Sequence, residues 1–137
     1  MWVVLNMLHR ISLEEITLAA KTVWPNRNVA MAIGEETMDI ITKTYKRKSS
    51  FFAGKTSRGL VGGLFYLLGY KYDVVKNQKE LADCLGTSDV TIRTSYRNWL
   101  EEFPDLFQET VTKLAQDQNL RWYLVVDCRQ KISQSQL

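Results

Sequence analysis

The 137-residue sequence contains only one histidine, two cysteines and two prolines. His9 alone cannot supply a histidine-based catalytic triad or a multi-histidine metal site. Cys84 and Cys128 are far apart and lack the paired spacing of a zinc ribbon, so we expect free, packed thiols. The sequence therefore indicates that the protein is not an enzyme, and we expect no catalytic residue, no cofactor and no metal.

Long hydrophobic runs are also missing. The opening segment MWVVLNML is too short to span a bilayer and lacks the cationic lead and cleavage site of a signal peptide. With 45% apolar and 24% charged residues, the composition is typical of a single globular domain. We expect a protein of the cell interior with no membrane partner, no internal repeat and no low-complexity linker.

The formal net charge of +3 is unevenly distributed along the chain. Residues 43–98 contain eleven Lys or Arg against four Asp or Glu, a balance of +7, whereas the remainder sums to −4. Residues 43–72 contain seven basic residues and no carboxylate. This regional excess indicates a polyanionic partner, although the charges at 46–48 can equally be solvated groups that complement a helix C-terminus.

Helical periodicity predicts a mainly α-helical chain. Ser12 with Glu15 and Asn77 with Glu80 have the spacing of a capping box, which marks the start of a helix. The expected helices span about 12–24, 28–48, 56–70, 77–86 and 88–103, and a further one near 105–116. The helix over 56–70 is the most apolar and should be central, with glycines at 59, 62, 63 and 69 that allow neighbours to cross closely.

The ends of the chain differ from this helical part. Residues 2–5 and 122–126 are rich in β-branched and aromatic side chains, so they predict short strands that pair with each other, or apolar caps. We therefore expect an N-terminal apolar extension over 1–11, a five-helix domain over 12–112, and a C-terminal extension over 113–137 with a mobile tail.

The segment 77–102 predicts two short helices around a turn at Gly86, the layout of a helix-turn-helix. In the second helix, four large side chains recur at helical spacing and should face inward: Ile92, Tyr96, Trp99 and Phe103. Another face carries Val90, Arg93, Thr94 and Arg97. Arginine can bond guanine, valine can pack on a thymine methyl, and threonine can serve base edges, so these four are candidate base readers. A solvated helical hairpin of an ordinary all-α protein would show a similar pattern.

The motif GKTSR at 54–58 opens the central helix. It is not a P-loop, because position 49 is Ser49 where that motif needs glycine. Amides at a helix start and nearby basic or hydroxyl side chains suit phosphate. The candidate phosphate contacts are Lys55, Thr56, Ser57, Arg58, Thr91, Lys46 and Arg47.

The segments FFAGKTSRGLVGGLFYLLGY at 51–70 and NQKELADCLGTSDVTIRTSYRNWLEEFPDLF at 77–107 resemble the second cyclin-like repeat of transcription initiation factor IIB and of its archaeal counterpart, transcription factor B. DVTIR at 89–93 followed by SYR at 95–97 is the most specific part. The resemblance implies a cyclin-like fold whose helix over 89–101 enters the major groove beside the TATA box. It places Val90 and Arg93 at base-reading positions and Lys55 on the DNA backbone.

The resemblance does not extend to the zinc ribbon, the linker that enters polymerase or a second repeat of that family. It therefore implies double-stranded DNA as a partner, with a TATA-binding protein as a further candidate partner, but not the usual recruitment of polymerase. It also implies a cytoplasmic, nucleoid-associated protein if the source is archaeal, or a nuclear one if it is eukaryotic.

The sequence thus predicts a DNA-binding, transcription factor-like protein with an accessory or regulatory role in transcription initiation. The alternative is a cyclin-like scaffold for protein–protein interactions that does not bind DNA. In that case Trp2, Trp122 and Tyr123 would form a dimer or partner surface. A homodimer that places two readers on DNA would combine both hypotheses.

Overall fold

The computed structural model describes residues 11–116, and this part of the chain is built from α-helices and short 3₁₀ segments. The elements are α2 (Leu13–Val23), α3 (Arg27–Arg47), η1 (Ser49–Phe52), α4 (Ser57–Lys71), α5 (Gln78–Leu85), α6 (Asp89–Glu102), η2 (Pro104–Phe107) and α7 (Gln108–Leu114). The prediction of a mainly helical chain is confirmed. The described part holds six α-helices: α2 to α6 lie where the five helices over 12–103 were expected, and α7 lies within the further helix expected near 105–116.

The starts of α2 and α5 are set by side chains that were recognisable in the sequence. The Ser12 hydroxyl accepts a hydrogen bond of 3.2 Å from the amide of Glu15 at the start of α2. Asn77 accepts one of 2.8 Å from the amide of Glu80 at the start of α5, and its side-chain amide donates to the Glu80 carboxylate. These contacts satisfy amides that have no partner within the helix. The predicted capping residues are therefore confirmed.

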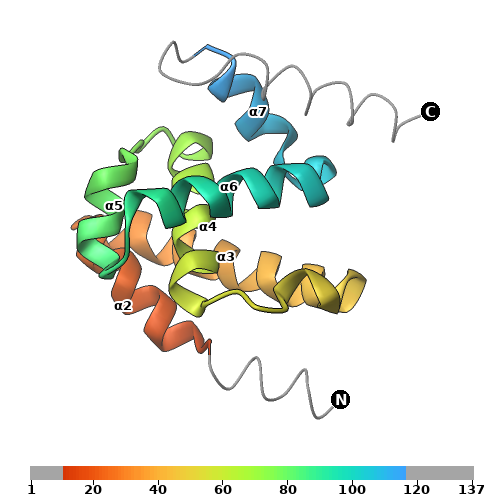
Figure 1. Ribbon diagram of the computed structural model, residues 1–137. Helices are drawn as coiled ribbons and strands as arrows, with labels where there is room; N and C mark the ends of the chain where they lie inside the picture. Colours follow the sequence, from red (N-terminus) through yellow and green to blue (C-terminus); the bar gives the residue numbers. More distant parts are fainter. Residues whose placement is uncertain (1–10, 117–137) are drawn as a thin grey trace.

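Helix α4 lies at the centre, and α6 runs across it (Figure 1). Twelve consecutive residues of α4, from Gly59 to Tyr70, are buried. Helices α3, α5, α6 and α7 all pack against it, while α2 packs on α3 and α5. A helix that is apolar on every side is stable in water only when it is surrounded in this way.

Two glycines of α4 allow α6 to approach closely. A Cβ atom on Gly62 would lie 2.3 Å from the Ile92 side chain, and one on Gly63 would lie 2.7 Å from the Ser95 Cβ. Both distances are too short for a real side chain. The predicted use of small residues at this crossing is confirmed. Each glycine destabilises the helix by about 1 kcal/mol relative to alanine, and the close packing of α6 offsets this loss.

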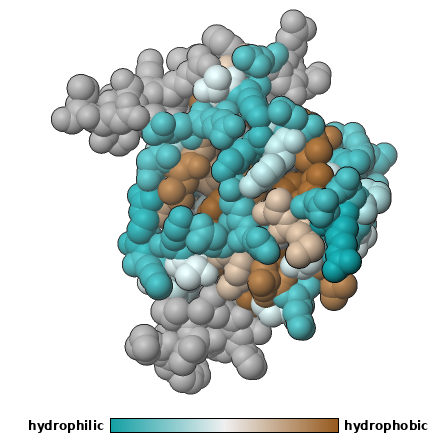
Figure 2. Space-filling view, turned by 180° about the vertical axis from the view of Figure 1, so that it is seen from behind, coloured by the Kyte–Doolittle hydropathy of each residue, from teal (hydrophilic) through white to brown (hydrophobic). Residues whose placement is uncertain are grey.

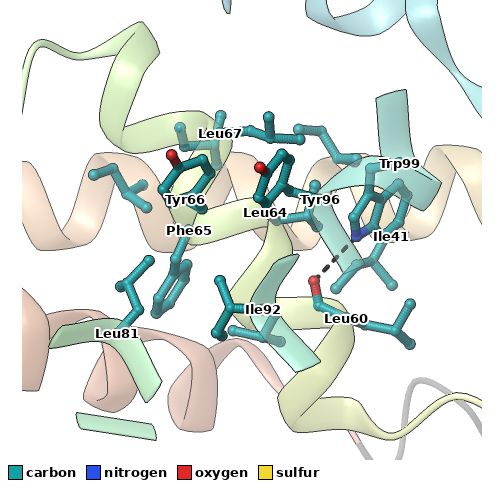
Figure 3. Packing of buried hydrophobic residues seen from close by; sticks show 14 of the residues in the cluster. Ile41, Leu60, Leu64, Phe65, Tyr66, Leu67, Leu81, Ile92, Tyr96 and Trp99 are labelled. Atoms are coloured by element: carbon teal, nitrogen blue, oxygen red, sulfur yellow. Dashed lines mark hydrogen bonds between the residues drawn. The ribbon is translucent and has the colours of Figure 1, made fainter. Parts of the chain in front are cut away.

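The core where α4 and α6 cross is rich in aromatic side chains (Figure 3). Phe51 of η1 packs against Trp99 and Phe103, with ring centroids 4.8 and 5.1 Å apart. The four positions of the α6 segment that were expected to face inward, Ile92, Tyr96, Trp99 and Phe103, are all buried. This cluster fixes the orientation of α6 on the central helix.

Some expectations differ from the structure or fall outside the described residues. Cys84 was expected to be a packed thiol but is exposed, and its Sγ lies 4.0 Å from the carbonyl of Thr22 in α2. The possible strands at 2–5 and 122–126 lie outside the described residues. The domain boundaries remain predictions, and α7 continues past 112 to a buried Leu114. Among the described helices, none is long and apolar enough to cross a membrane.

Candidate nucleic-acid interface

The outward side of α6 carries the four candidate base readers along one ridge. Val90 is 57% exposed and Thr94 is exposed, whereas Arg93 and Arg97 are half-buried. The ridge lies opposite the buried side of the helix, which packs on α4. The Ser88 hydroxyl caps α6 by accepting a hydrogen bond of 3.1 Å from the amide of Thr91. We call Val90, Arg93, Thr94 and Arg97 the α6 ridge.

The two arginines of the α6 ridge have no carboxylate partner within residues 11–116. No ion pair of this part of the chain involves Arg93 or Arg97. The Nε atom of Arg97 is buried and has no hydrogen-bond partner there. Their positive charge is therefore not neutralised by the acidic side chains that the structure describes.

A groove of about 390 Å³ runs beside the α6 ridge. One wall is formed by Lys55 and Thr56, just before and at the cap of α4. The other wall is formed by Val90, Thr91 and Thr94 of α6. The structure thus brings two candidate phosphate contacts from the GKTSR motif next to candidate base readers, although about 35 residues of chain separate them.

Lys55 and Thr56 are held in place by local contacts. The ammonium of Lys55 donates to the carbonyl of Phe51 and lies 4.4 Å from the centre of the Phe51 ring. Thr56 caps α4, because its hydroxyl accepts a hydrogen bond of 3.1 Å from the amide of Gly59. Both side chains remain exposed to solvent. An ammonium has three donors, so Lys55 keeps donors free for an anion in the groove.

Ser57 and Arg58 lie on the opposite side of the same helix start. They line a smaller, mainly apolar hollow of about 220 Å³ together with Ile16 of α2 and Leu85 of α5. The guanidinium of Arg58 donates a hydrogen bond of 3.3 Å to the carbonyl of Gly86. The GKTSR motif is therefore divided between two hollows, a division that residue spacing does not reveal.

The basic run at 46–48 is largely engaged within the fold. Arg47 forms a two-point ion pair with Asp105, at 2.9 and 3.3 Å, and lies over the Phe103 ring. Lys48 pairs with Glu102 at 2.6 Å. Lys46 is exposed and has no ion pair within the described residues. These contacts tie the end of α3 to the end of α6 and to η2.

An ionic cluster at the other end of α4 was not foreseen. Glu36 is half-buried and accepts hydrogen bonds from Lys71 at 2.7 Å and Tyr72 at 3.1 Å. Burial and the neighbouring carboxylate raise the pKa of Tyr72. Burial alone would lower the pKa of Lys71, but the hydrogen bond and charge of Glu36 outweigh it and raise that pKa. Residue spacing gives no sign of this cluster, because Lys71 and Tyr72 lie 35 and 36 residues from Glu36 in the sequence.

Within residues 11–116, no three His, Cys, Asp or Glu side chains cluster so as to hold a metal ion. Residues 11–116 instead define a helical domain in which α6 presents two arginines, free of ion pairs within this part of the chain, beside a groove that holds Lys55. Such an arrangement of positive charge can form an interface for a polyanion.

Over part of its length the chain is similar to transcription initiation factor IIB. It is 43% identical over 51 residues to the Aeropyrum pernix protein, 30% over 76 residues to transcription initiation factor IIB 2 of Saccharolobus solfataricus, and 34% over 65 residues to the Sulfurisphaera tokodaii protein. These matches cover 37, 56 and 47% of this chain but only 16, 25 and 20% of the relatives. No family model and no solved structure matches the chain.

Proposed function

We propose that this protein binds double-stranded DNA through the α6 ridge and acts in transcription initiation, in an accessory or regulatory role. The observation that carries the proposal is the groove in which Lys55 and Thr56 lie beside Val90 and Thr94. The partial similarity to transcription initiation factor IIB supports the same function. In this proposal, residues 12–112 correspond to the second cyclin-like repeat of that family, and α5 with α6 forms a helix-turn-helix.

The α6 ridge suits the major groove of B-form DNA, which is about 12 Å wide and admits an α-helix. Arg93 and Arg97 would donate hydrogen bonds to guanine. Val90 would pack on a thymine methyl, and Thr94 would contact a base edge. Such contacts give sequence preference, whereas contacts with phosphates fix the position of the protein on the duplex.

The phosphate contacts in this proposal come chiefly from the groove. Lys55, Thr56 and Thr91 line it, and Lys46 adds an exposed ammonium on the same basic stretch of sequence. Arg47, Ser57 and Arg58 were also candidates. Arg47 is engaged in its ion pair with Asp105, and Ser57 and Arg58 lie in the hollow on the far side of the α4 start. These three residues are therefore weaker contributors to phosphate binding.

The proposal is tested by measuring binding of the full chain to labelled duplexes by fluorescence anisotropy over a range of salt concentrations. If about three to five phosphates are neutralised, log affinity should fall against log salt with a slope of roughly −3 to −4.5. Selection of bound duplexes from a random pool, with and without a TATA-binding protein, would identify the preferred site. Undetectable or salt-independent binding would reject the proposal.

A scaffold for protein–protein interactions is the second candidate, and one observation favours it. Leu13 and Leu18 of α2 are 46 and 63% exposed and line one shallow hollow, and Met31 of α3 is 38% exposed. The face opposite to that of Figure 1 shows hydrophobic groups gathered between hydrophilic ones (Figure 2). Light scattering after size exclusion would detect self-association, and a salt-dependent mobility shift would separate this function from DNA binding.

A further inference from the structure

Arg58 points away from the surface to which the GKTSR motif assigns it. Lys55 and Thr56 line the groove beside α6, whereas Arg58 lines the hollow between α2, α4 and α5. A phosphate held by Lys55 in the groove is therefore on the other side of the α4 N-terminus from the Arg58 guanidinium. Another role is needed to explain this arginine.

The charge of Arg58 is unfavourable for its own helix and favourable for a neighbouring one. It lies in the first turn of α4, which has no acidic residue, and a cation there opposes the helix dipole. Helix α5 lacks a basic residue in its last turn, where a cation would be stabilising. The Arg58 guanidinium bonds the carbonyl of Gly86, the first residue after α5, at 3.3 Å. Arg58 thus supplies the cation that the C-terminus of α5 lacks.

The hydrogen bond from Arg58 to Gly86 also affects α6, because Gly86 lies in the turn that leads into that helix. Gly86 has a left-handed conformation, with φ at 67°, and a Cβ atom there would lie 3.4 Å from the Arg58 guanidinium. Only Thr87 separates Gly86 from Ser88, which caps α6, and Val90 follows within the first turn. Fixing the Gly86 carbonyl therefore fixes the start of α6 relative to α4.

We propose that Arg58 is a positioning residue that fastens the α5–α6 turn to the start of α4 and does not bind phosphate. It sets the spacing between Lys55 in the groove and the α6 ridge, and with it the alignment of base contacts with backbone contacts. The role in base reading rests on the proposed function. The fastening of the turn does not.

The DNA test compares Arg58→Ala with Lys55→Ala and with Lys21→Ala, which removes an exposed cation of α2 that no candidate contact uses. Affinities of the full chain for its selected duplex and for a random duplex are measured over a salt series. Arg58→Ala should reduce the ratio of the two affinities about fivefold while leaving the salt slope unchanged. A slope reduced by about one unit, with equal weakening on both duplexes, would make Arg58 a phosphate ligand and overturn the proposal.

Amide hydrogen exchange tests the fastening of the turn without DNA. Arg58→Ala should speed exchange at residues 86–91 about fivefold, whereas Lys55→Ala should not, and Arg58→Lys should restore most of the protection. Unchanged exchange in Arg58→Ala would overturn the positioning role even if DNA binds. Faster exchange with an unchanged affinity ratio would overturn its link to base reading. If the wild-type chain binds no duplex, the proposed function fails, and exchange alone decides the role of Arg58.

Discussion

The indole Nε1 of Trp99 donates a hydrogen bond of 3.1 Å to the backbone carbonyl of Leu60, and both residues are buried (Figure 3). The bond joins the last turn of α6 to the first turn of α4, where Leu60 also lines the groove. It complements the glycine crossing, because the close approach at Gly62 and Gly63 brings the indole within reach of that carbonyl. The buried side of α6, opposite the α6 ridge, is thus held on α4 by both packing and this hydrogen bond.

Trp99→Phe should destabilise the domain without changing the chemistry of the ridge. The substitution removes the indole donor and leaves a small cavity, so the free energy of unfolding should fall by about 2–3 kcal/mol. Urea denaturation followed by circular dichroism measures this loss. A change below about 0.5 kcal/mol would show that the bond and the packing around it contribute little.

Gly63→Ala should destabilise the domain, although alanine favours helices over glycine. The new Cβ atom would lie 2.7 Å from the Ser95 Cβ and 2.8 Å from the amide nitrogen of Tyr96, so α6 must move outward. We expect a loss of about 1–3 kcal/mol in thermal or urea unfolding. Gly69→Ala is the matched control, because its nearest contacts at 3.4 Å or more are ordinary. It should be neutral or stabilising by up to about 1 kcal/mol.

Arg93→Ala and Lys55→Ala should weaken DNA binding in different ways. Loss of Arg93 should cost about 1–3 kcal/mol on the selected duplex and flatten the sequence preference, since a base contact is removed. Loss of Lys55 should weaken all duplexes alike and reduce the salt slope by about one. Anisotropy titrations on selected and random duplexes distinguish the two. Identical profiles for both variants would contradict the assignment of separate roles.

The pair of Arg47 and Asp105 should contribute to stability more than to DNA binding. Both side chains are more than a third exposed, so a double-mutant cycle of Arg47→Ala and Asp105→Ala should give a coupling of only about 0.5 kcal/mol. Unfolding in urea at low and high salt measures it, and salt should weaken it. A strong loss of DNA affinity in Arg47→Ala alone would show that the pair opens to release a phosphate ligand.

Stability should fall at alkaline pH because of the cluster around Glu36. The pKa values of Lys71 and Tyr72 are both raised in the folded chain, so each holds its proton more tightly there than when unfolded. Their contribution is fully present below the unfolded pKa values, near 10, and is lost as pH rises through the folded ones. Glu36→Gln should make the melting temperature less sensitive to pH between about 9 and 11.5. An unaltered pH profile would contradict this coupling.

The helix starts could be predicted because the signals are local. Ser12 with Glu15 and Asn77 with Glu80 lie three residues apart, and both contacts are present. The left-handed Gly86 and the buried side of α6 follow from equally short-range patterns. For the helix near 105–116, the structure instead forms η2 over Pro104–Phe107 before α7 begins.

The parts of the site that depend on distant partners could not be predicted. Arg47 meets Asp105 across 58 residues of sequence, and Arg58 meets Gly86 across 28. Residue spacing places Lys55 and Arg58 in one basic motif. In the structure they lie on opposite sides of the start of α4 and line different hollows. The roles of the α6 ridge in base reading remain predictions.

The complete enclosure of α4 has a consequence for synthesis of the chain on the ribosome. Its apolar surface is covered by α3, which is made before it, and by α5, α6 and α7, which are made after it. Until roughly residue 114 has emerged, part of the apolar surface of α4 is exposed to water, and exposed apolar surface promotes aggregation. We therefore expect no stable fragment that ends before α7, and a requirement for protection from aggregation during translation.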